Sequence, residues 1–212
     1  MVGLTPGCGR RPTRINAKGE SSVGNYRTVQ TLIIANIVGF LVELAVGENL
    51  TVGLGGLWPL GVNFMPWQVV SYAFLHANLM HLAFNMFGLW MFGRELEALL
   101  GGRRFMQLYF ASVLSAAAMQ LLVDSMTGGV FPTVGASGGI FGLLLAYGLF
   151  FPNRMVMLLI PPIPMPARVF VVLYAGLELF LGVTGTEAGV AHFAHLGGMI
   201  GAYLVLRRRR GR

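Results

Sequence analysis

The sequence has little charge and almost no cysteine, and each shortage excludes a class of protein. Charged residues make up 11% of the 212 residues, against about 25% in a typical soluble domain. Cys8 is the single cysteine, so the chain has no internal disulfide framework and no cysteine-based zinc site. It also has no phosphate-binding loop, dinucleotide fingerprint or metal-spaced His/Cys cluster. We therefore expect no metal and no cofactor.

Long apolar segments take the place of the missing charge. Hydrophobic residues form 55% of the chain, and the mean hydropathy is +0.69. Most of the segments approach the roughly 20 residues that cross a bilayer. They are residues 29–46, 69–92, 105–123, 136–151, 167–183 and 189–206. We predict an all-α polytopic membrane protein with six transmembrane helices. Residues 1–28 would form a flexible cytosolic leader, 29–206 the membrane domain and 207–212 a basic cytosolic tail.

The order of the segments puts all the basic residues on the same side of the membrane. The loops on the other side carry only Glu48, Asp124 and Glu187. Positive charge favours the cytoplasmic side of a membrane, so we predict a multi-pass protein of the cell membrane with both termini in the cytoplasm. The arginine-rich tail is then a topology anchor near anionic lipid rather than a nucleic-acid site. The fifteen basic residues are Arg10, Arg11, Arg14, Lys18, Arg27, Arg94, Arg103, Arg104, Arg154, Arg168, Arg207, Arg208, Arg209, Arg210 and Arg212.

Four polar residues inside the apolar segments are the candidate functional groups. Ser137 follows Gly135 and Ala136 at the start of the fourth segment, His81 and Asn85 lie in the second, and His195 lies in the sixth. Strongly polar side chains in spanning helices are costly and usually mark function. Taken singly, each also has a structural interpretation. A buried histidine or asparagine often joins helices by hydrogen bonds, and a serine can bond to its own helix backbone.

Together these residues supply the groups that acyl transfer requires. A serine hydroxyl becomes a good nucleophile when a base takes its proton, and His195 is the candidate base for Ser137. His81 and Asn85 are four residues apart and share one helix face. With the backbone N–H of Ser137 they are candidates for an oxyanion hole. Because no aspartate lies near His195 in the sequence, we predict a Ser–His dyad rather than a triad.

The predicted orientation puts these residues at a similar depth. His81 lies about twelve residues into the second segment, or about 18 Å along a helix. Ser137 opens the short fourth segment, and His195 follows the outer loop by about two turns. We expect the three residues to meet in a submerged cavity that is open to the outer side. Water must enter this cavity because hydrolysis consumes it and irregular backbone needs partners.

Other polar residues have less decisive interpretations. We expect His76 and Asn78 to be interfacial and to face water. His192 lies three residues before His195, so it would line the cavity or be solvated. Glu43 and Glu178 lie within apolar segments. They could form a proton-coupling pair, but interior hydrogen-bonded positions are the preferred interpretation.

Three motifs occur in order along the chain. They are His81-x-x-x-Asn85, Gly135-x-Ser137-Gly138 and Ala194-His195-Leu196-Gly197-Gly198. Their order and segments resemble those of the rhomboid intramembrane serine proteases, over roughly residues 29–206. The resemblance implies a six-helix bundle and a Ser137–His195 dyad, with His81 and Asn85 stabilising the oxyanion. It also implies that the substrates are single-pass membrane proteins, cut near the outer end of their transmembrane segment.

The same resemblance suggests further roles and shows two departures. Phe84 matches an aromatic residue implied in lateral gating, and Glu97 matches a structural position in the inner turn. Residues 48–66, with Trp58 and Phe64, resemble a membrane-dipping first loop that ends near Trp67. Gln68 stands where many members have arginine. Phe141 stands where several have a tyrosine against the histidine, and it keeps the ring but has no hydroxyl.

Two other functions are weighed against a protease. A catalytically silent rhomboid-like binder of membrane proteins would keep the fold and lose Ser137 or His195, and both are present. A small transporter would show pseudo-repeated halves with matched broken helices, and no such repeat is apparent. The sequence therefore favours an intramembrane serine endopeptidase.

Overall fold

The computed structural model describes residues 26–157, 162–185 and 191–210. Most of the predicted leader, with Cys8, lies outside these residues, as does Glu187 of the predicted outer loop. The first helix begins at Arg27, so the last two residues assigned to the leader are helical. The division into leader, membrane domain and tail otherwise stays a prediction.

The described chain is largely helical. Each predicted apolar segment overlaps one longer helix: α1 (Arg27–Val46), α4 (Leu79–Leu100), α5 (Gly102–Thr127), α6 (Ser137–Phe150), α7 (Ala167–Thr184) and α8 (His192–Arg210). Three of them, α1, α5 and α7, are long and apolar enough to cross a membrane. The shorter elements are α2 (Glu48–Gly55), α3 (Gln68–Ser71) and the 3-10 helix η1 (Tyr72–Phe74). The fold is thus that of a helical polytopic membrane protein.

The second predicted segment had the wrong start. Helix α4 begins at Leu79, not at residue 69, because the Asn78 side chain caps it by accepting a hydrogen bond from the His81 N–H at 2.8 Å. His81 consequently lies in the first turn of α4 and not about twelve residues inside a helix. The expectation that His76 faces water is also wrong, since His76 is buried and its ring meets that of His81 edge-on at 5.2 Å.

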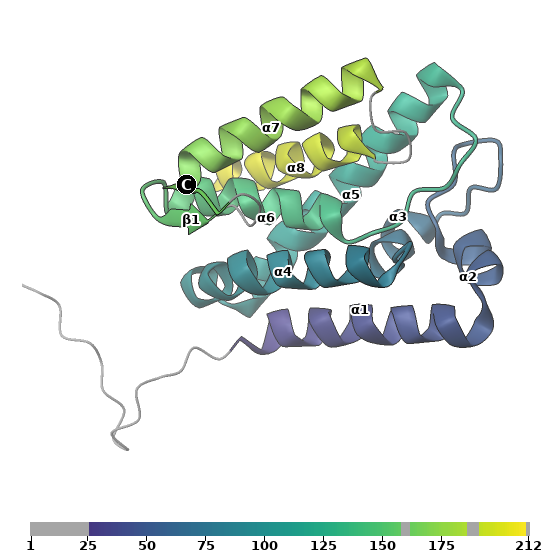
Figure 1. Cartoon of the computed structure of the whole chain (residues 1–212), viewed down its shortest axis with the longest axis horizontal. Coiled ribbons are helices and arrows are strands. Elements are labelled where there is room, and N and C mark those ends of the chain that lie inside the picture. Colours follow the sequence, from purple (N-terminus) through teal and green to yellow (C-terminus); the bar gives the residue numbers. More distant parts are fainter. Residues whose placement is uncertain (1–25, 158–161, 186–190, 211–212) are drawn as a thin grey trace, which may run out of the picture.

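Helix α6 lies in the middle of the bundle. It packs against α4, α5, α7 and α8, and Figure 1 shows α1 on the outer side of α4 and α7 on the opposite side of the molecule. Nine of its residues are buried, among them Gly138, Gly142 and Leu143. A helix that is apolar around its whole circumference is typical of such a central position.

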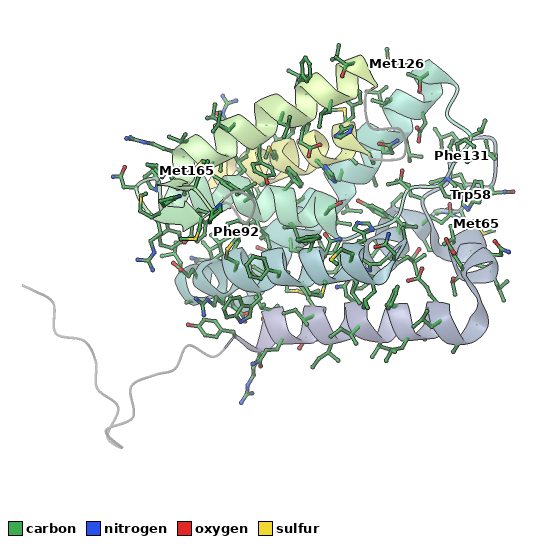
Figure 2. The ribbon with its side chains drawn as sticks, viewed as in Figure 1. Trp58, Met65, Phe92, Met126, Phe131 and Met165 are labelled. Atoms are coloured by element: carbon green, nitrogen blue, oxygen red, sulfur yellow. The ribbon has the colours of Figure 1, made fainter. Side chains whose placement is uncertain are left out.

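The two ends of the bundle differ in character. The basic residues of the described chain lie at the start of α1, around the junction of α4 and α5, between α6 and α7, at the start of α7, and at the end of α8. Figure 1 shows these points together at one end. The labelled side chains of Trp58, Met65, Met126 and Phe131 lie toward the other end (Figure 2). This arrangement agrees with the charge asymmetry from which the topology was predicted.

Glu97 joins two helices at the basic end. Its carboxylate oxygens accept hydrogen bonds from the backbone N–H groups of Thr28 and Val29, both at 2.9 Å. These donors belong to the first turn of α1, which has no intrahelical partner for them. The structural role implied for Glu97 is therefore visible as a cap supplied by a neighbouring helix.

A short antiparallel pair of strands joins α6 to α7, an addition to the all-α prediction. Strands β1 (Met155–Met157) and β2 (Pro164–Pro166) pair with Val156 opposite Met165. The end of the sixth predicted segment also needs correction. Helix α8 continues to Arg210, so it extends beyond residue 206 and includes the arginines from 207 to 210, whose place in a cytosolic tail stays a prediction.

Candidate active site

Ser137 and His195 are hydrogen-bonded across two helices. Ser137 is the first residue of α6, and His195 lies in the first turn of α8. The Nε2 atom of His195 is 2.8 Å from the Ser137 Oγ, which is within the range for direct proton transfer. Although 58 positions separate them in the chain, the fold brings the predicted nucleophile and base together.

Glycines allow this close approach. A Cβ atom at Gly198 would overlap the backbone carbonyl of Gly138, and one at Gly142 would lie 2.8 Å from the Gly198 oxygen. Gly198 therefore faces backbone, which cannot move aside as a side chain can. Gly142 faces the Gly198 backbone and also the Ser112 side chain of α5, which its Cβ would overlap. The backbones of α6 and α8 touch, as the small-xxx-small spacing suggests for membrane helices.

The segment before Ser137 is fixed by backbone hydrogen bonds. Leu57 and Thr133 exchange two of them at 2.9 Å, which ties this segment to the loop after α2. The N–H of Gly135 donates to the backbone carbonyl of Tyr72 at 2.9 Å. The side-chain hydroxyl of Tyr72 in turn donates to the backbone carbonyl of Val113 at 2.8 Å. Ser137 is thus anchored both to the first loop and to α5.

Gly135 brings His81 close to Ser137. Its φ angle of 127° lies in the region that favours glycine. A Cβ atom there would lie 2.8 Å from Cε1 and 2.9 Å from Nε2 of His81. The imidazole of His81 consequently packs on the backbone of Gly135, two residues before the nucleophile. Only glycine meets both the conformational and the steric requirement at this position.

The predicted oxyanion residues face the same cavity as Ser137. The cavity has a volume of about 1070 Å³, and its lining includes His81, Asn85, Ser137 and His195. Asn85 is buried, and its amide nitrogen donates one hydrogen bond to the His81 carbonyl at 2.9 Å. An amide nitrogen carries two N–H groups, so the second remains for a ligand in the cavity.

Two phenylalanines differ in how they meet this cavity. Phe84 of α4 lines it and is 56% exposed on the surface of the molecule. Phe141 of α6 stacks on His195, with ring centroids 4.2 Å apart and planes inclined by 4°. Phe84 therefore lies where the cavity meets the outer surface of the bundle. Phe141 fixes the plane of the imidazole without a hydroxyl group.

Sequence reasoning missed the partner on the other side of His195. The Oε2 atom of Glu178 in α7 lies 2.9 Å from His195 Nδ1 and 2.7 Å from His192 Nδ1. An apolar segment interrupted by one glutamate was the available signal, and it suggested an interior hydrogen-bonded position. That position is confirmed, since Glu178 is buried. Glu43 is buried likewise, and it accepts a hydrogen bond from the His76 N–H at 2.9 Å.

The placement of His192 corrects an expectation. We predicted that it lines the cavity or is solvated, but its side chain is buried and is not among the described residues that line the cavity. The hydrogen bond to Glu178 explains why His192 is buried, because a buried carboxylate needs hydrogen-bond donors. Glu178, His192 and His195 offer atoms within 4.8 Å of one another that could hold a metal ion. Hydrogen bonds already join these atoms, and the absence of a metal site stays a prediction.

Gln68, the other departure from the resemblance, anchors the first loop. Its side chain is fully buried. Its oxygen accepts bonds from the N–H groups of Met65 and Trp58 at 3.0 and 3.3 Å, and its nitrogen donates to the carbonyls of Leu54 and Asn63 at 3.4 and 3.3 Å. A neutral amide thus holds the loop that precedes α4.

Comparison with known proteins places the chain in a family. The model of the Rhomboid domain matches residues 63–209, well over half of the chain. The chain belongs to the Rhomboid family. It is 32% identical over 140 residues to Rhomboid protein 1, mitochondrial, of Saccharomyces cerevisiae, covering 62% of this chain and 38% of that protein.

Relatives named as proteases are also similar. Rhomboid protease GluP of Bacillus subtilis is 28% identical over 65% of this chain and 25% of its own length. Rhomboid protease GlpG of Serratia proteamaculans is 29% identical over 82% of this chain and 59% of its own length. The chain therefore spans less than two thirds of each of these relatives. It is a membrane protein of a family that includes intramembrane proteases.

Proposed function

We propose that this protein is an intramembrane serine endopeptidase with Ser137 as the nucleophile and His195 as the general base. The observation that carries the proposal is the 2.8 Å contact between Ser137 Oγ and His195 Nε2. It lies on a cavity inside an apolar helical bundle. A nucleophile within hydrogen-bond reach of an oriented base is the signature of covalent catalysis.

Acylation follows from this geometry. The Ser137 Oγ attacks a peptide carbonyl carbon as its proton passes to His195 Nε2, and the carbonyl π electrons move to the oxygen. The oxyanion returns its electrons to carbon, the C–N bond breaks, and the leaving amine takes the proton from His195. In the second half, water attacks the acyl-serine and gives a proton to His195. Ser137 recovers that proton as it leaves, and the free acid is released.

The oxyanion has three candidate partners. Ser137 begins α6, so its N–H belongs to the first helical turn, where backbone donors have no intrahelical acceptor and the helix dipole favours negative charge. Asn85 has an amide N–H left for the cavity, and His81 packs beside Gly135. Donors fixed in place before reaction stabilise developing charge most effectively.

Substrate class and orientation are parts of the same proposal. The cavity is lined by residues of both α4 and α7, among them Phe84 and Tyr174, so a transmembrane segment would reach it from the bilayer. We assign single-pass membrane proteins as substrates. His81, Ser137 and His195 all lie near the first residue of their helices, at the end away from the basic residues. This favours cytoplasmic termini, a site open to the outer side and location in the cell membrane.

The proposal is tested by removing the Ser137 hydroxyl and measuring cleavage and probe labelling. Purified parent protein in detergent should cleave a model single-pass substrate and react with a fluorophosphonate probe, and Ser137→Ala should do neither. Ser125→Ala is the matched control, because the Ser125 hydroxyl is exposed and bonds only its own helix at Leu122 in α5. It should behave as the parent. Parental cleavage by Ser137→Ala would refute the serine mechanism.

A further inference from the structure

The Glu178 carboxylate connects α7 to the base on α8. Its Oε2 atom is within 2.9 Å of His195 Nδ1, on the opposite edge of the imidazole from the nitrogen that meets Ser137. The three groups therefore form a continuous chain from carboxylate through imidazole to hydroxyl. The same oxygen lies 2.7 Å from His192 Nδ1.

This geometry determines which nitrogen of neutral His195 carries the proton. An ionised carboxylate only accepts hydrogen bonds, so a nitrogen bonded to it must be a donor. One oxygen that contacts two imidazole nitrogens fits an acceptor, because a single carboxyl proton could serve only one of them. With its proton on Nδ1, His195 has a free lone pair on Nε2, which is the form that a general base for Ser137 requires.

His192 holds the carboxylate in place. It donates to Glu178 from the same helix as His195, one turn earlier. A buried carboxylate needs such donors, because an unpaired charge away from water is strongly unfavourable. Phe141 then fixes the imidazole by its face, with the ring planes 4° from parallel. The remaining freedom of His195 is rotation within that plane, and the bond to Glu178 limits it.

The geometry points to Glu178 as a positioning residue that sets the tautomer and orientation of His195, which would make the proposed dyad a Ser137–His195–Glu178 triad. This inference rests on the proposed function. Glu178 is not itself among the described residues that line the cavity, and its contact with the site is the one to His195, so its effect on the reaction passes through the imidazole. It should also stabilise the imidazolium that forms when Ser137 loses its proton, as a buried carboxylate does in other serine hydrolases.

Two substitutions separate the parts of this role. Glu178→Leu has a similar volume and removes both the acceptor and the charge. We expect fluorophosphonate labelling to fall by a factor on the order of 10², since a hydrogen bond to a charged group is lost. Glu178→Gln keeps an oxygen acceptor and removes the charge. Labelling should fall by about tenfold, the difference between a charged and a neutral hydrogen bond.

The tautomer is read directly by ¹⁵N NMR of histidine-labelled protein. The chain has four histidines, so single substitutions assign their signals. The parent and Glu178→Gln should show His195 protonated on Nδ1, and Glu178→Leu should show a shift toward Nε2. Glu97→Gln is the matched control. It changes another buried glutamate that accepts two hydrogen bonds, and it should lower stability without altering the His195 signals or the labelling rate of folded protein.

The outcomes decide the inference separately from the proposed function. Parental His195 signals, or parental labelling, in folded Glu178→Leu would overturn it. If that variant does not fold, a parental labelling rate in Glu178→Gln would overturn the role of the charge. Should the parent itself neither label nor cleave, the proposed function fails. The NMR spectra would still show whether Glu178 sets the tautomer.

Discussion

The contact between α6 and α8 allows a quantitative prediction for Gly198→Ala. The added Cβ would overlap the Gly138 oxygen and lie 2.8 Å from its carbonyl carbon. Backbone cannot rotate away as a side chain can, so the two helices must separate by an amount on the order of 1 Å. Overpacking of this kind costs about 1–3 kcal/mol of stability.

The same separation acts on the site. Ser137 immediately precedes Gly138, and His195 lies one turn before Gly198. The 2.8 Å contact between Ser137 Oγ and His195 Nε2 would therefore lengthen as the two helices separate. Beyond about 3.2 Å proton transfer loses direct reach. A misplacement of about 1 Å is enough for a loss of roughly 10²-fold. We expect Gly198→Ala to lower the labelling rate of folded protein by about that factor, and to lower its thermal midpoint.

The control for this variant is an alanine substitution at a glycine where an added Cβ has open space. A Cβ at Gly176 in α7 would meet no atom within 4 Å. Gly176→Ala should therefore label at the parental rate and keep the parental midpoint or exceed it, since alanine favours helix. Both variants are measured as the initial rate of fluorophosphonate labelling, alongside thermal unfolding in the same detergent. Equal rates for Gly198→Ala and Gly176→Ala would refute the close-packing argument.

The remaining predictions concern the base and the topology. His195→Ala should abolish fluorophosphonate labelling, because the serine proton then has no acceptor. Asn85→Ala removes one of several oxyanion donors, so its labelling should persist at a rate about 10²–10³ lower. In a Cys8→Ser background, a cysteine at Met126 should react with an impermeant thiol reagent in intact cells, and one at Arg103 should not. The reverse labelling pattern would contradict the predicted orientation.

Sequence patterns predicted the helices well and one boundary badly. Apolar runs mark buried or lipid-facing helices because the bilayer accepts little else, and each predicted run overlaps one of the longer helices. The second run is apolar from residue 69 onward, yet α4 begins only at Leu79. Composition does not reveal this break. A single side-chain cap from Asn78 sets it, together with the extended backbone at Leu75.

The candidate site was predictable where a local motif encodes a close approach. The glycines next to Ser137 and after His195 indicate that two backbones meet, and the structure brings these helices into contact. The contact between His195 and Glu178 of α7 was not predictable in this way. Which residue of α7 faces α8 depends on the rotation of α7 about its axis, and one glutamate in an apolar helix shows only that its side chain turns inward.

Phe141 and Glu178 together explain how His195 can be oriented without a tyrosine hydroxyl beside it. An imidazole must be fixed both in its plane and in its rotation within that plane. Phe141 supplies the first constraint by stacking at 4.2 Å, which requires only an aromatic face. Glu178 supplies the second through the hydrogen bond at Nδ1, 2.9 Å away. Because these constraints come from different helices, loss of one leaves the other in place. Substituting Glu178 should then disturb the tautomer of His195 more than its stacking.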